Sequence, residues 1–300
     1  MELERFTGCL LGLALGDALG TPLEFERRGS FAPLTDLVGG GPFGLQAGQW
    51  TDDTSMALCL GTSLVECGGF DARDQMERYV RWWRSGYLSS TGECFDIGNT
   101  TRRALARFAH GGDPFAGSAA PDSAGNGSIM RLAPVAMFFF PDALAAAHYA
   151  AESSRTTHAA PEALDACRLL AAMLCRALAG EPKEAVLRGS AVSFRGASRI
   201  AALARGDYLA KPEREIRGSG YVVESLEAAL FCFAHGASYA DAVLRAANLG
   251  DDADTTAAVC GQLAGAHYGE AGIPAAWLAR LAMREEIATL AERLARAVRP

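Results

Sequence analysis

The segment Leu249-Gly250-Asp251-Asp252-Ala253-Asp254-Thr255-Thr256 is followed at once by the apolar run 257–266, which is rich in Ala, Val and Cys. About two hundred residues earlier, Gln49-Trp50-Thr51-Asp52-Asp53-Thr54 stands in the same way before residues 56–60. Acidic groups just ahead of an apolar run are typical of a helix N-terminus, where free N–H groups and the helix dipole favour negative charge. We therefore expect one helix to begin at each segment.

Helix capping alone does not account for these two segments. A cap needs a single side chain, whereas the two segments hold five carboxylates and several hydroxyls, and neighbouring carboxylates repel one another unless a cation neutralises them. Oxygen ligands without His or Cys favour Mg²⁺, Mn²⁺ or Ca²⁺ over zinc. We favour a divalent metal site holding two ions over a pair of simple helix caps.

Composition limits the class of protein. The chain has 300 residues, of which 50% are hydrophobic and 21% charged, so a large core is available and disorder is not expected. The net charge of −7 argues against direct nucleic-acid binding, which needs clustered Lys and Arg. A small phosphorylated ligand held by metal and backbone remains compatible with this charge.

The eight cysteines show no Cys-x-x-Cys spacing, and most lie in apolar helical runs, as Cys59 and Cys260 do. Buried free thiols in a reducing cytoplasm explain them better than disulfides or zinc ligands. The first residues are acidic and do not resemble a signal peptide. The longest apolar stretch is expected near residues 132–140, where Pro134 interrupts it, and it is too short to span a bilayer. We expect a cytoplasmic monomer with no membrane segment.

Hydrophobic residues recur at spacings of three and four, whereas strict alternation is nearly absent. This spacing predicts helices around residues 76–83, 164–174 and 226–233, and one last helix carrying Leu278 and Leu281 and continuing to Val298. Gly/Pro turns separate the runs, and no long linker divides them. The prediction is an all-α fold: one compact multi-helix domain over 1–300.

Glycines repeat at intervals of four near both ends of the chain. One set is Gly8, Gly12 and Gly16, and the other is Gly261, Gly265 and Gly269. Each glycine in a helix interior costs about 1 kcal/mol relative to Ala, so a packing reason is expected. Either the two helices pass close together in the core, or they are two unrelated glycine-rich helices.

Four further segments are candidates for chemistry. These are Gly16-Asp17-Ala18-Leu19-Gly20-Thr21-Pro22-Leu23-Glu24, Gly125-Asn126-Gly127-Ser128-Ile129-Met130-Arg131, Ser154-Arg155-Thr156-Thr157-His158, and Gly218-Ser219-Gly220-Tyr221. The glycine-bracketed turn can face phosphates with its backbone N–H groups. Taken singly, His158 reads more readily as a buried hydrogen-bonding residue and Tyr221 as a packing residue.

In this order, the segments resemble the ADP-ribosylglycohydrolase family, which includes the dinitrogenase reductase-activating glycohydrolase and the ADP-ribosylarginine and ADP-ribosylserine hydrolases. The resemblance runs from about Phe6 to Gly269, and the Thr-Asp-Asp-Thr and Asp-x-Asp-Thr pair is its most specific part. It implies a compact all-α fold with two Mg²⁺ or Mn²⁺ ions at the base of a cleft. The metal ligands it implies are Glu24, Thr51, Asp52, Asp53, Asp252, Asp254 and Thr255. Asp251 departs from the pattern, because many members have a second Gly there.

The resemblance also implies roles in cleaving an ADP-ribosyl glycoside, a reaction that passes through an oxocarbenium-like transition state. The residues expected to take part in catalysis are Glu24, as a mobile gating or acid/base group, together with Asp53 and Asp252. Substrate contacts are expected from Asp96, Gly125, Asn126, Gly127, Ser128, His158, Gly220 and Tyr221. Of these, the 125–128 turn would take the diphosphate, Tyr221 would stack against adenine or close its pocket, and Asp96 would meet a cationic leaving group. The alternative for Asp96 is an N-cap of a helix starting at Ile97.

These features predict a metal-dependent hydrolase that removes arginine-linked ADP-ribose from protein or from a small molecule. The alternatives are serine- or nucleobase-linked substrates, or an inactive homologue that only binds ADP-ribose. A terpenoid synthase would need aspartates four apart in the first segment and an aromatic cavity, yet only 8% of residues are aromatic. A His-Asp phosphohydrolase is excluded, because no His-Asp dipeptide occurs.

Overall fold

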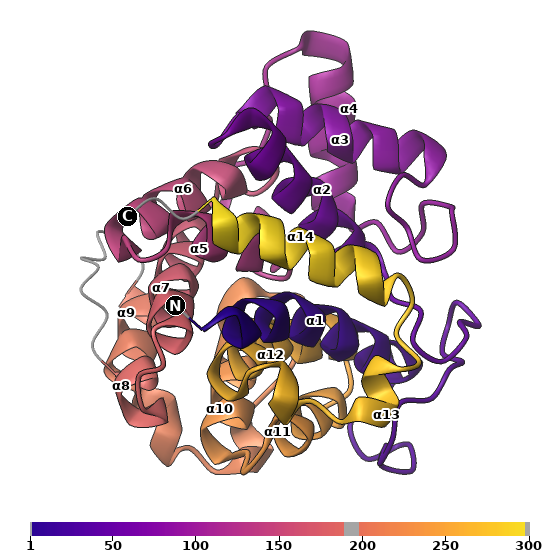
Figure 1. The fold of residues 1–300 in the computed structure, drawn as a ribbon, viewed down its shortest axis with the longest axis vertical. Helices are drawn as coiled ribbons and strands as arrows, with labels where there is room; N and C mark the ends of the chain where they lie inside the picture. The colour runs from indigo at the N-terminus through magenta and orange to yellow at the C-terminus, as the bar shows by residue number, and fades with distance from the viewer. Residues whose placement is uncertain (1, 189–197, 298–300) are drawn as a thin grey trace.

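The computed structural model describes residues 2–188 and 198–297. Within these ranges the chain forms helices joined by turns, and the only β-pairing is in isolated bridges (Figure 1). The α-helices are α1 (Leu3–Gly20), α2 (Asp52–Cys67), α3 (Ala72–Ser85), α4 (Asn99–Gly111), α5 (Ala133–Phe139), α6 (Ala143–Arg155), α7 (Pro161–Leu178), α8 (Lys183–Leu187), α9 (Ser198–Arg205), α10 (Val222–His235), α11 (Tyr239–Ala247), α12 (Ala253–Tyr268), α13 (Ala275–Leu278) and α14 (Arg284–Arg296). Short 3₁₀ turns are η1 (Thr21–Leu23), η2 (Pro121–Ser123), η3 (Asp207–Ala210), η4 (Glu213–Glu215) and η5 (Glu270–Gly272).

The centre of the molecule is a pair of helices from opposite ends of the chain, α1 and α12 (Figure 1). A Cβ atom added to Gly12 would lie 2.4 Å from the backbone oxygen of Gly261, and one added to Gly265 would overlap the backbone of Gly8. Only glycine permits so close a backbone approach. Of the two explanations for the glycine repeats, close packing is confirmed.

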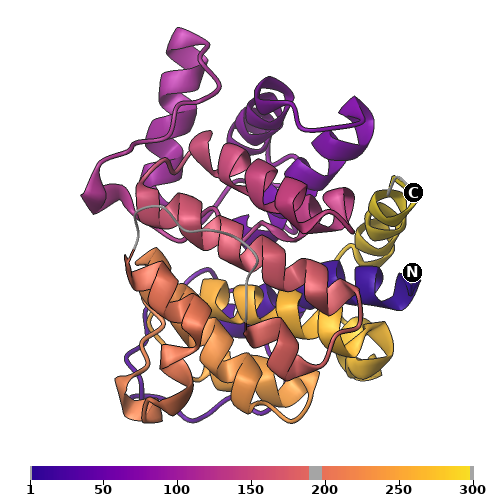
Figure 2. The same ribbon diagram turned by 90° about the vertical axis from the view of Figure 1, so that its left-hand side faces the viewer.

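The packing of α1 against α12 determines where the acidic segments lie. The second acidic segment leads into α12, and α1 ends in the loop that carries Glu24. Helices α2, α3 and α4 form one end of the molecule, α10 and α11 lie at the opposite end, and α6 and α7 run along one side (Figures 1 and 2).

The predicted helices around residues 76–83, 164–174 and 226–233 are confirmed as α3, α7 and α10. The prediction of a single last helix is wrong. The chain leaves α13 after Leu278 and begins α14 only at Arg284, because Met283 adopts a left-handed φ of 52° and the Ala282 N–H is bonded to the Gly48 oxygen instead. Val298 lies outside the described residues.

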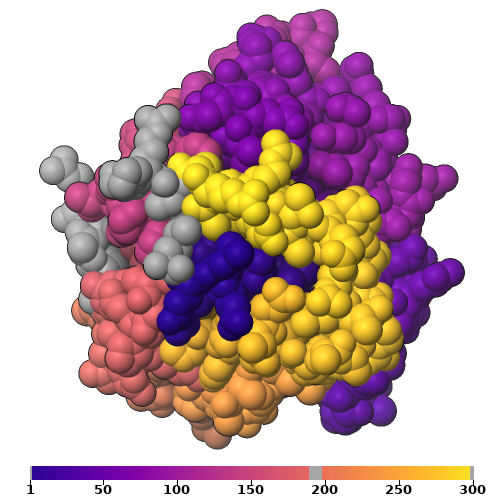
Figure 3. Space-filling view, in the orientation of Figure 1, coloured from indigo at the N-terminus to yellow at the C-terminus, as the bar shows by residue number. Residues whose placement is uncertain are grey.

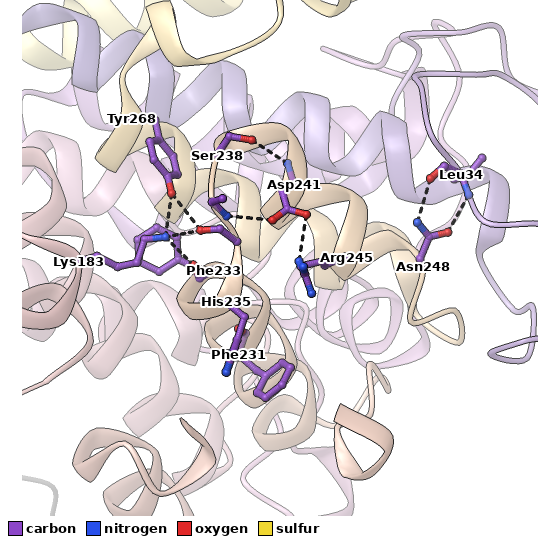
Figure 4. Close-up of polar contacts among 12 residues, drawn as sticks. Leu34, Lys183, Phe231, Phe233, His235, Ser238, Asp241, Arg245, Asn248 and Tyr268 are labelled. Carbon is purple, nitrogen blue, oxygen red and sulfur yellow. Dashed lines mark hydrogen bonds and ion pairs between the residues drawn. The ribbon is translucent and has the colours of Figure 1, made fainter. Parts of the chain in front are cut away.

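Helices α8, α10, α11 and α12 are fastened by side chains at their ends (Figure 4). The ammonium of Lys183 donates to the Phe233 carbonyl oxygen at 3.0 Å and to the Tyr268 hydroxyl at 2.8 Å. A cation at these positions satisfies carbonyls that a helix C-terminus leaves free. At the other end of α11, the Asn248 side chain exchanges two hydrogen bonds with the backbone of Leu34, just before the second acidic segment.

Helix α1 accounts for most of the apolar character at the N-terminus. The window Leu3–Leu23 has a mean hydropathy of 1.3, long and apolar enough to cross a membrane, yet 94% of it is buried within the fold. The expectation that the longest apolar stretch is at residues 132–140 is therefore wrong. The face in Figure 3 shows the start of α1 between α14 and the α12–α13 region.

Six cysteines are buried free thiols, Cys67 is exposed and Cys94 is half-buried.

Candidate active site

The two acidic segments meet at the start of α2 and α12. Asp52 is the first residue of α2, and Asp252 is the N-cap of α12. The Thr255 hydroxyl donates to Oδ1 of Asp53 at 3.2 Å, and Oγ1 of Thr51 lies 3.4 Å from Oδ2 of Asp254. Residues two hundred positions apart therefore share one cluster, which is the juxtaposition that a common metal site requires.

Another buried carboxylate, that of Asp17, supports the first segment from α1. It is fully buried, and its two oxygens accept four hydrogen bonds, from the backbone N–H and the hydroxyl of both Thr51 and Thr54. Thr51 makes no side-chain capping bond of its own, so Asp17 caps α2 from a neighbouring helix. Sequence analysis did not assign this role. The available signal was a charged residue between Gly16 and Ala18 in an otherwise apolar helix.

Two further carboxylates complete the cluster. Ligand oxygens of Glu24, Asp96 and Asp254 all lie within 4.8 Å of one another. Glu24 follows η1 and is 6% exposed, whereas Asp96 stands in the loop before α4 with a φ of 57°. Helix α4 begins only at Asn99 with Gly98 as its N-cap, so the alternative that Asp96 caps a helix at Ile97 is wrong.

The electrostatics of this cluster are unfavourable for anions. Burial, followed by repulsion from neighbouring carboxylates, raises the pKa values of Asp52, Asp53 and Asp254 well above the usual range. The same causes raise the pKa of Glu24 to about 10 and that of Asp96 to about 7. So many carboxylates can be ionised together only if positive charge is supplied among them.

The donor set fits a hard divalent cation. Oε2 of Glu24 and Oδ2 of Asp53 are buried and have no hydrogen-bond partner among the described residues. Buried polar atoms are rarely left unpaired, and a bound cation would satisfy both oxygens. Carboxylate and hydroxyl oxygens with no His or Cys among them suit Mg²⁺, Mn²⁺ or Ca²⁺.

A cavity of about 870 Å³ opens above the cluster. Of the predicted site residues, those that line it are Glu24, Asp52, Asp96, Gly125, Asn126, Gly127, His158, Gly220, Asp252, Asp254 and Thr255. Thr51 and Asp53 are fully buried beneath this surface. The acidic cluster therefore forms one part of the wall, and the glycine turn forms another.

The glycine turn packs directly on His158. A Cβ at Gly127 would lie 2.7 Å from Cε1 of His158, so a larger residue at this position would displace the ring. The side-chain amide of Asn126 donates to Oδ2 of Asp252 at 2.9 Å, which ties the turn to the acidic cluster. The turn and its neighbours thus present small, polar surface to a ligand.

Two predicted substrate residues lie behind the cavity wall. Ser128 is 3% exposed, and its hydroxyl accepts from the thiol of Cys167. Tyr221 pairs through its backbone with Gly125, while its hydroxyl donates to Glu162 at 2.5 Å. Neither side chain lines the cavity in this structure.

Phe25 is a cavity residue that sequence analysis missed. It is 70% exposed, lines the cavity beside Glu24, and has a φ of 65°. Its N–H donates to the Asp251 oxygen at 2.7 Å, and the Asp251 N–H donates to the Glu26 oxygen at 2.7 Å. Asp251 itself has a φ of 56°, which explains why glycine suits this position and why Asp, which tolerates the left-handed region, can replace it.

The first turn of α4, residues 99–101, was also missed as cavity lining, although its Asn-Thr-Thr sequence after a glycine was a visible signal.

Comparison with known proteins identifies the family of this chain. The family model described as ADP-ribosylglycohydrolase matches residues 1–300. The chain is 48% identical over 292 residues to "ADP-ribosylarginine hydrolase Tri1" of Pseudomonas putida (strain GB-1), covering 97% of this chain and 78% of that protein. It is 34% identical over 287 residues to "ADP-ribosyl-[dinitrogen reductase] glycohydrolase" of Rhodospirillum rubrum, covering 94% and 92%. A solved structure, "ADP-ribosylglycohydrolase-related protein complex", superposes with a TM-score of 0.86 at 44% identity and covers 99% of both chains.

The chain belongs to the ADP-ribosylglycohydrolase family. The resemblance seen in the sequence and the all-α fold that it implied are both confirmed.

Proposed function

We propose that this protein hydrolyses the N-glycosidic bond between ADP-ribose and an arginine side chain. The observation that carries the proposal is the carboxylate cluster at the cavity wall, in a chain 48% identical to a protein named as an ADP-ribosylarginine hydrolase. An arginine leaving group is a cation with two-pronged donor geometry, which a carboxylate such as Asp96 complements.

Mg²⁺ or Mn²⁺, as two ions, would be held by Glu24, Thr51, Asp52, Asp53, Asp252, Asp254 and Thr255. When bound, such ions supply Lewis acidity to the ribose hydroxyls and to water at the site. The chain itself keeps these ligands in place, since Asp17 fixes the start of α2 and Asn126 holds Asp252.

The protein's own proton-transfer group in this proposal is Glu24, assisted by Asp53 and Asp252. Glu24 lines the cavity, so its carboxyl group is placed to exchange a proton with a substrate or water molecule bound there. Glu24 directly follows η1 and precedes Phe25, and both residues line the cavity. Movement of this segment would therefore open or close the cavity.

The substrate would extend from the acidic cluster along the cavity. The diphosphate would lie against the turn of Gly125, Asn126 and Gly127. Adenine would lie near Gly220, and Tyr221 would contact it only after its side chain turns away from Glu162. The leaving arginine would lie near Asp96 and beneath the exposed ring of Phe25. An aromatic face attracts a guanidinium, and backbone strain at an exposed residue is often found at functional positions.

The substrate would be an ADP-ribosylated protein or a small-molecule ADP-ribose conjugate. We further propose that the protein works as a monomer in the cytoplasm, without a nucleic-acid or membrane partner. Its net charge of −7 is consistent with the absence of a phosphate-backbone ligand.

A release assay tests the proposed reaction. ADP-ribose linked to arginine, serine or a nucleobase would be offered to the purified protein with Mg²⁺, with Mn²⁺ and with EDTA. We expect release from arginine that EDTA abolishes. If ADP-ribose is released only from serine or a nucleobase, that linkage is the substrate and the arginine linkage is not. Tight ADP-ribose binding without release from any substrate would mean that the protein is a binding homologue.

A further inference from the structure

A buried arginine lies under the glycine turn. Arg131 is 1% exposed, and its contacts among the described residues are with neutral groups. Its guanidinium lies 4.6 Å from the centre of the Tyr79 ring, and Nη1 lies 3.5 Å from the Met56 sulfur. Burying a charge without a counter-ion is costly, so a specific role is expected for it.

The strongest polar contact of Arg131 begins a short hydrogen-bond chain. Nη2 of Arg131 donates to Oγ1 of Thr157 at 2.6 Å, and the same oxygen lies 2.9 Å from Nδ1 of His158. Arginine can only donate, so Thr157 accepts from it, and the Thr157 hydroxyl hydrogen remains available. Within the described chain the only acceptor bonded to that hydroxyl is Nδ1 of His158.

This chain assigns the protons on His158. Burial, followed by the charge of Arg131, lowers the pKa of His158 to about 3, so the ring is neutral and carries one N–H. Because Nδ1 accepts from Thr157, the hydrogen is on Nε2. The Thr157 oxygen has a second lone pair, but if it also accepted from Nδ1 its own hydrogen would be left without an acceptor among the described residues, so the Nε2–H tautomer satisfies more of these buried groups.

The protonated nitrogen faces the ligand cavity. His158 lines the cavity, and Nε2 would lie 3.1 Å from a Cβ on Gly127 and 3.3 Å from one on Gly125. No hydrogen-bond partner for Nε2 is present among the described residues, in contrast to Nδ1. A donor that the protein leaves unused at a cavity wall is available to an acceptor on the ligand.

We propose that Arg131 is a positioning residue that acts through Thr157 to hold His158 as the Nε2–H tautomer, so that the ring donates to a diphosphate oxygen of the bound ADP-ribosyl group. The identity of the ligand rests on the proposed function above. The proposal makes His158 a fixed hydrogen-bond donor and excludes it as the acid or base of the reaction.

The tautomer can be read in the ligand-free protein by ¹⁵N and ¹³C NMR of labelled histidine, with His158→Gln identifying the resonance. Thr157→Val removes the hydroxyl at nearly constant shape, and Thr157→Ser restores it. Thr156→Val is the matched control, since Thr156 is also buried and hydrogen-bonded but contacts Ser153 and Gln75 instead of His158. ADP-ribose binding is measured on the same proteins with Mg²⁺ present.

We expect Nε2–H in the wild type, in Thr157→Ser and in Thr156→Val, and loss of the single tautomer in Thr157→Val. The Kd for ADP-ribose should rise about tenfold in Thr157→Val, as for loss of one hydrogen bond to a charged acceptor, with KM affected more than kcat. If Thr157→Val does not fold, His158→Gln and His158→Asn serve instead. The Gln amide reaches towards the Nε2 position and should bind ADP-ribose better than the shorter Asn.

An Nδ1–H tautomer in the wild type would overturn the proposal, as would wild-type binding by Thr157→Val or equal binding by the Gln and Asn variants. The proposed reaction can fail separately. If the protein shows the expected tautomer and ADP-ribose affinity but releases nothing from arginine, the roles of Arg131, Thr157 and His158 stand and the proposed substrate is wrong.

Discussion

Oδ1 of Asp17 accepts both the backbone N–H and the hydroxyl of Thr51, each at 2.9 Å, and thereby holds the start of α2 against α1. Thr51 is the residue that lies next to Asp254 of the other acidic segment. The geometry of the cluster therefore depends on a carboxylate whose own oxygens are both committed to hydrogen bonds.

Asp17→Asn should destabilise the protein by about 1–3 kcal/mol, because the amide nitrogen would face N–H and O–H donors in a buried site. Urea unfolding measures the loss. Asp71→Asn is the matched control: Asp71 caps α3 at an exposed position, where Asn caps about as well as Asp. Equal stability of the two variants would contradict the role assigned to Asp17.

Gly12→Ala should cost about 1–3 kcal/mol or more, since its Cβ would meet the Gly261 backbone oxygen at 2.4 Å and two helices would have to separate. Gly111→Ala is the comparison, because a Cβ at this position in α4 has nothing within 4 Å and alanine is the better helix former. Thermal melting of both variants checks the prediction, which a harmless Gly12→Ala would disprove.

Asp254→Asn should melt at a higher temperature than the wild type in EDTA, because it removes one charge from a buried group of like charges. Wild-type protein should gain stability on adding Mg²⁺ or Mn²⁺, by about 2.7 kcal/mol at one hundred times the Kd, and the variant should gain far less. Calorimetric melting with and without metal separates these effects. Hydrolysis should be lost in the variant, and normal turnover would remove Asp254 from the metal site.

Asp96→Asn should reduce kcat/KM on ADP-ribosylarginine by at least about tenfold, through loss of a charge-assisted contact with guanidinium. A serine-linked substrate has no cationic leaving group and should be affected far less. Because Asp96 also lies in the group with Glu24 and Asp254, metal affinity is measured alongside. Equal losses on both substrates, together with weaker metal binding, would make Asp96 a metal ligand instead.

Phe25→Ala should raise KM for arginine-linked substrates about fivefold to tenfold while leaving ADP-ribose binding unchanged, since the ring lies on the leaving-group side of the proposed complex. Leu144→Ala is the matched control: Leu144 is similarly exposed, at 64% against 70%, but lies on α6 and does not line the cavity. Weaker binding of free ADP-ribose by Phe25→Ala would place the ring over the nucleotide instead.

The all-α class and the helices that begin at both acidic segments could be predicted from the sequence, because hydrophobic spacing and N-terminal acidic groups are local properties of the chain. The family could also be recognised from the sequence, because each of the two Asp/Thr motifs is a run of consecutive residues. The break between α13 and α14 could not be predicted in this way, because apolar spacing continues across it. The helix is interrupted where the Ala282 N–H bonds to the oxygen of Gly48, a residue distant in the chain.

The surroundings of the acidic residues could not be predicted from the sequence, because they come from helices distant in the chain. Asp17 caps α2 through its hydrogen bonds to Thr51 and Thr54, which come from a different helix. Phe25 lines the cavity with its backbone N–H bonded to the Asp251 oxygen. Likewise, Tyr221 turns its hydroxyl to Glu162, and Thr157 joins a buried arginine to His158. Spacing along a chain predicts which residues share a helix face, whereas contacts between distant segments depend on how the helices pack.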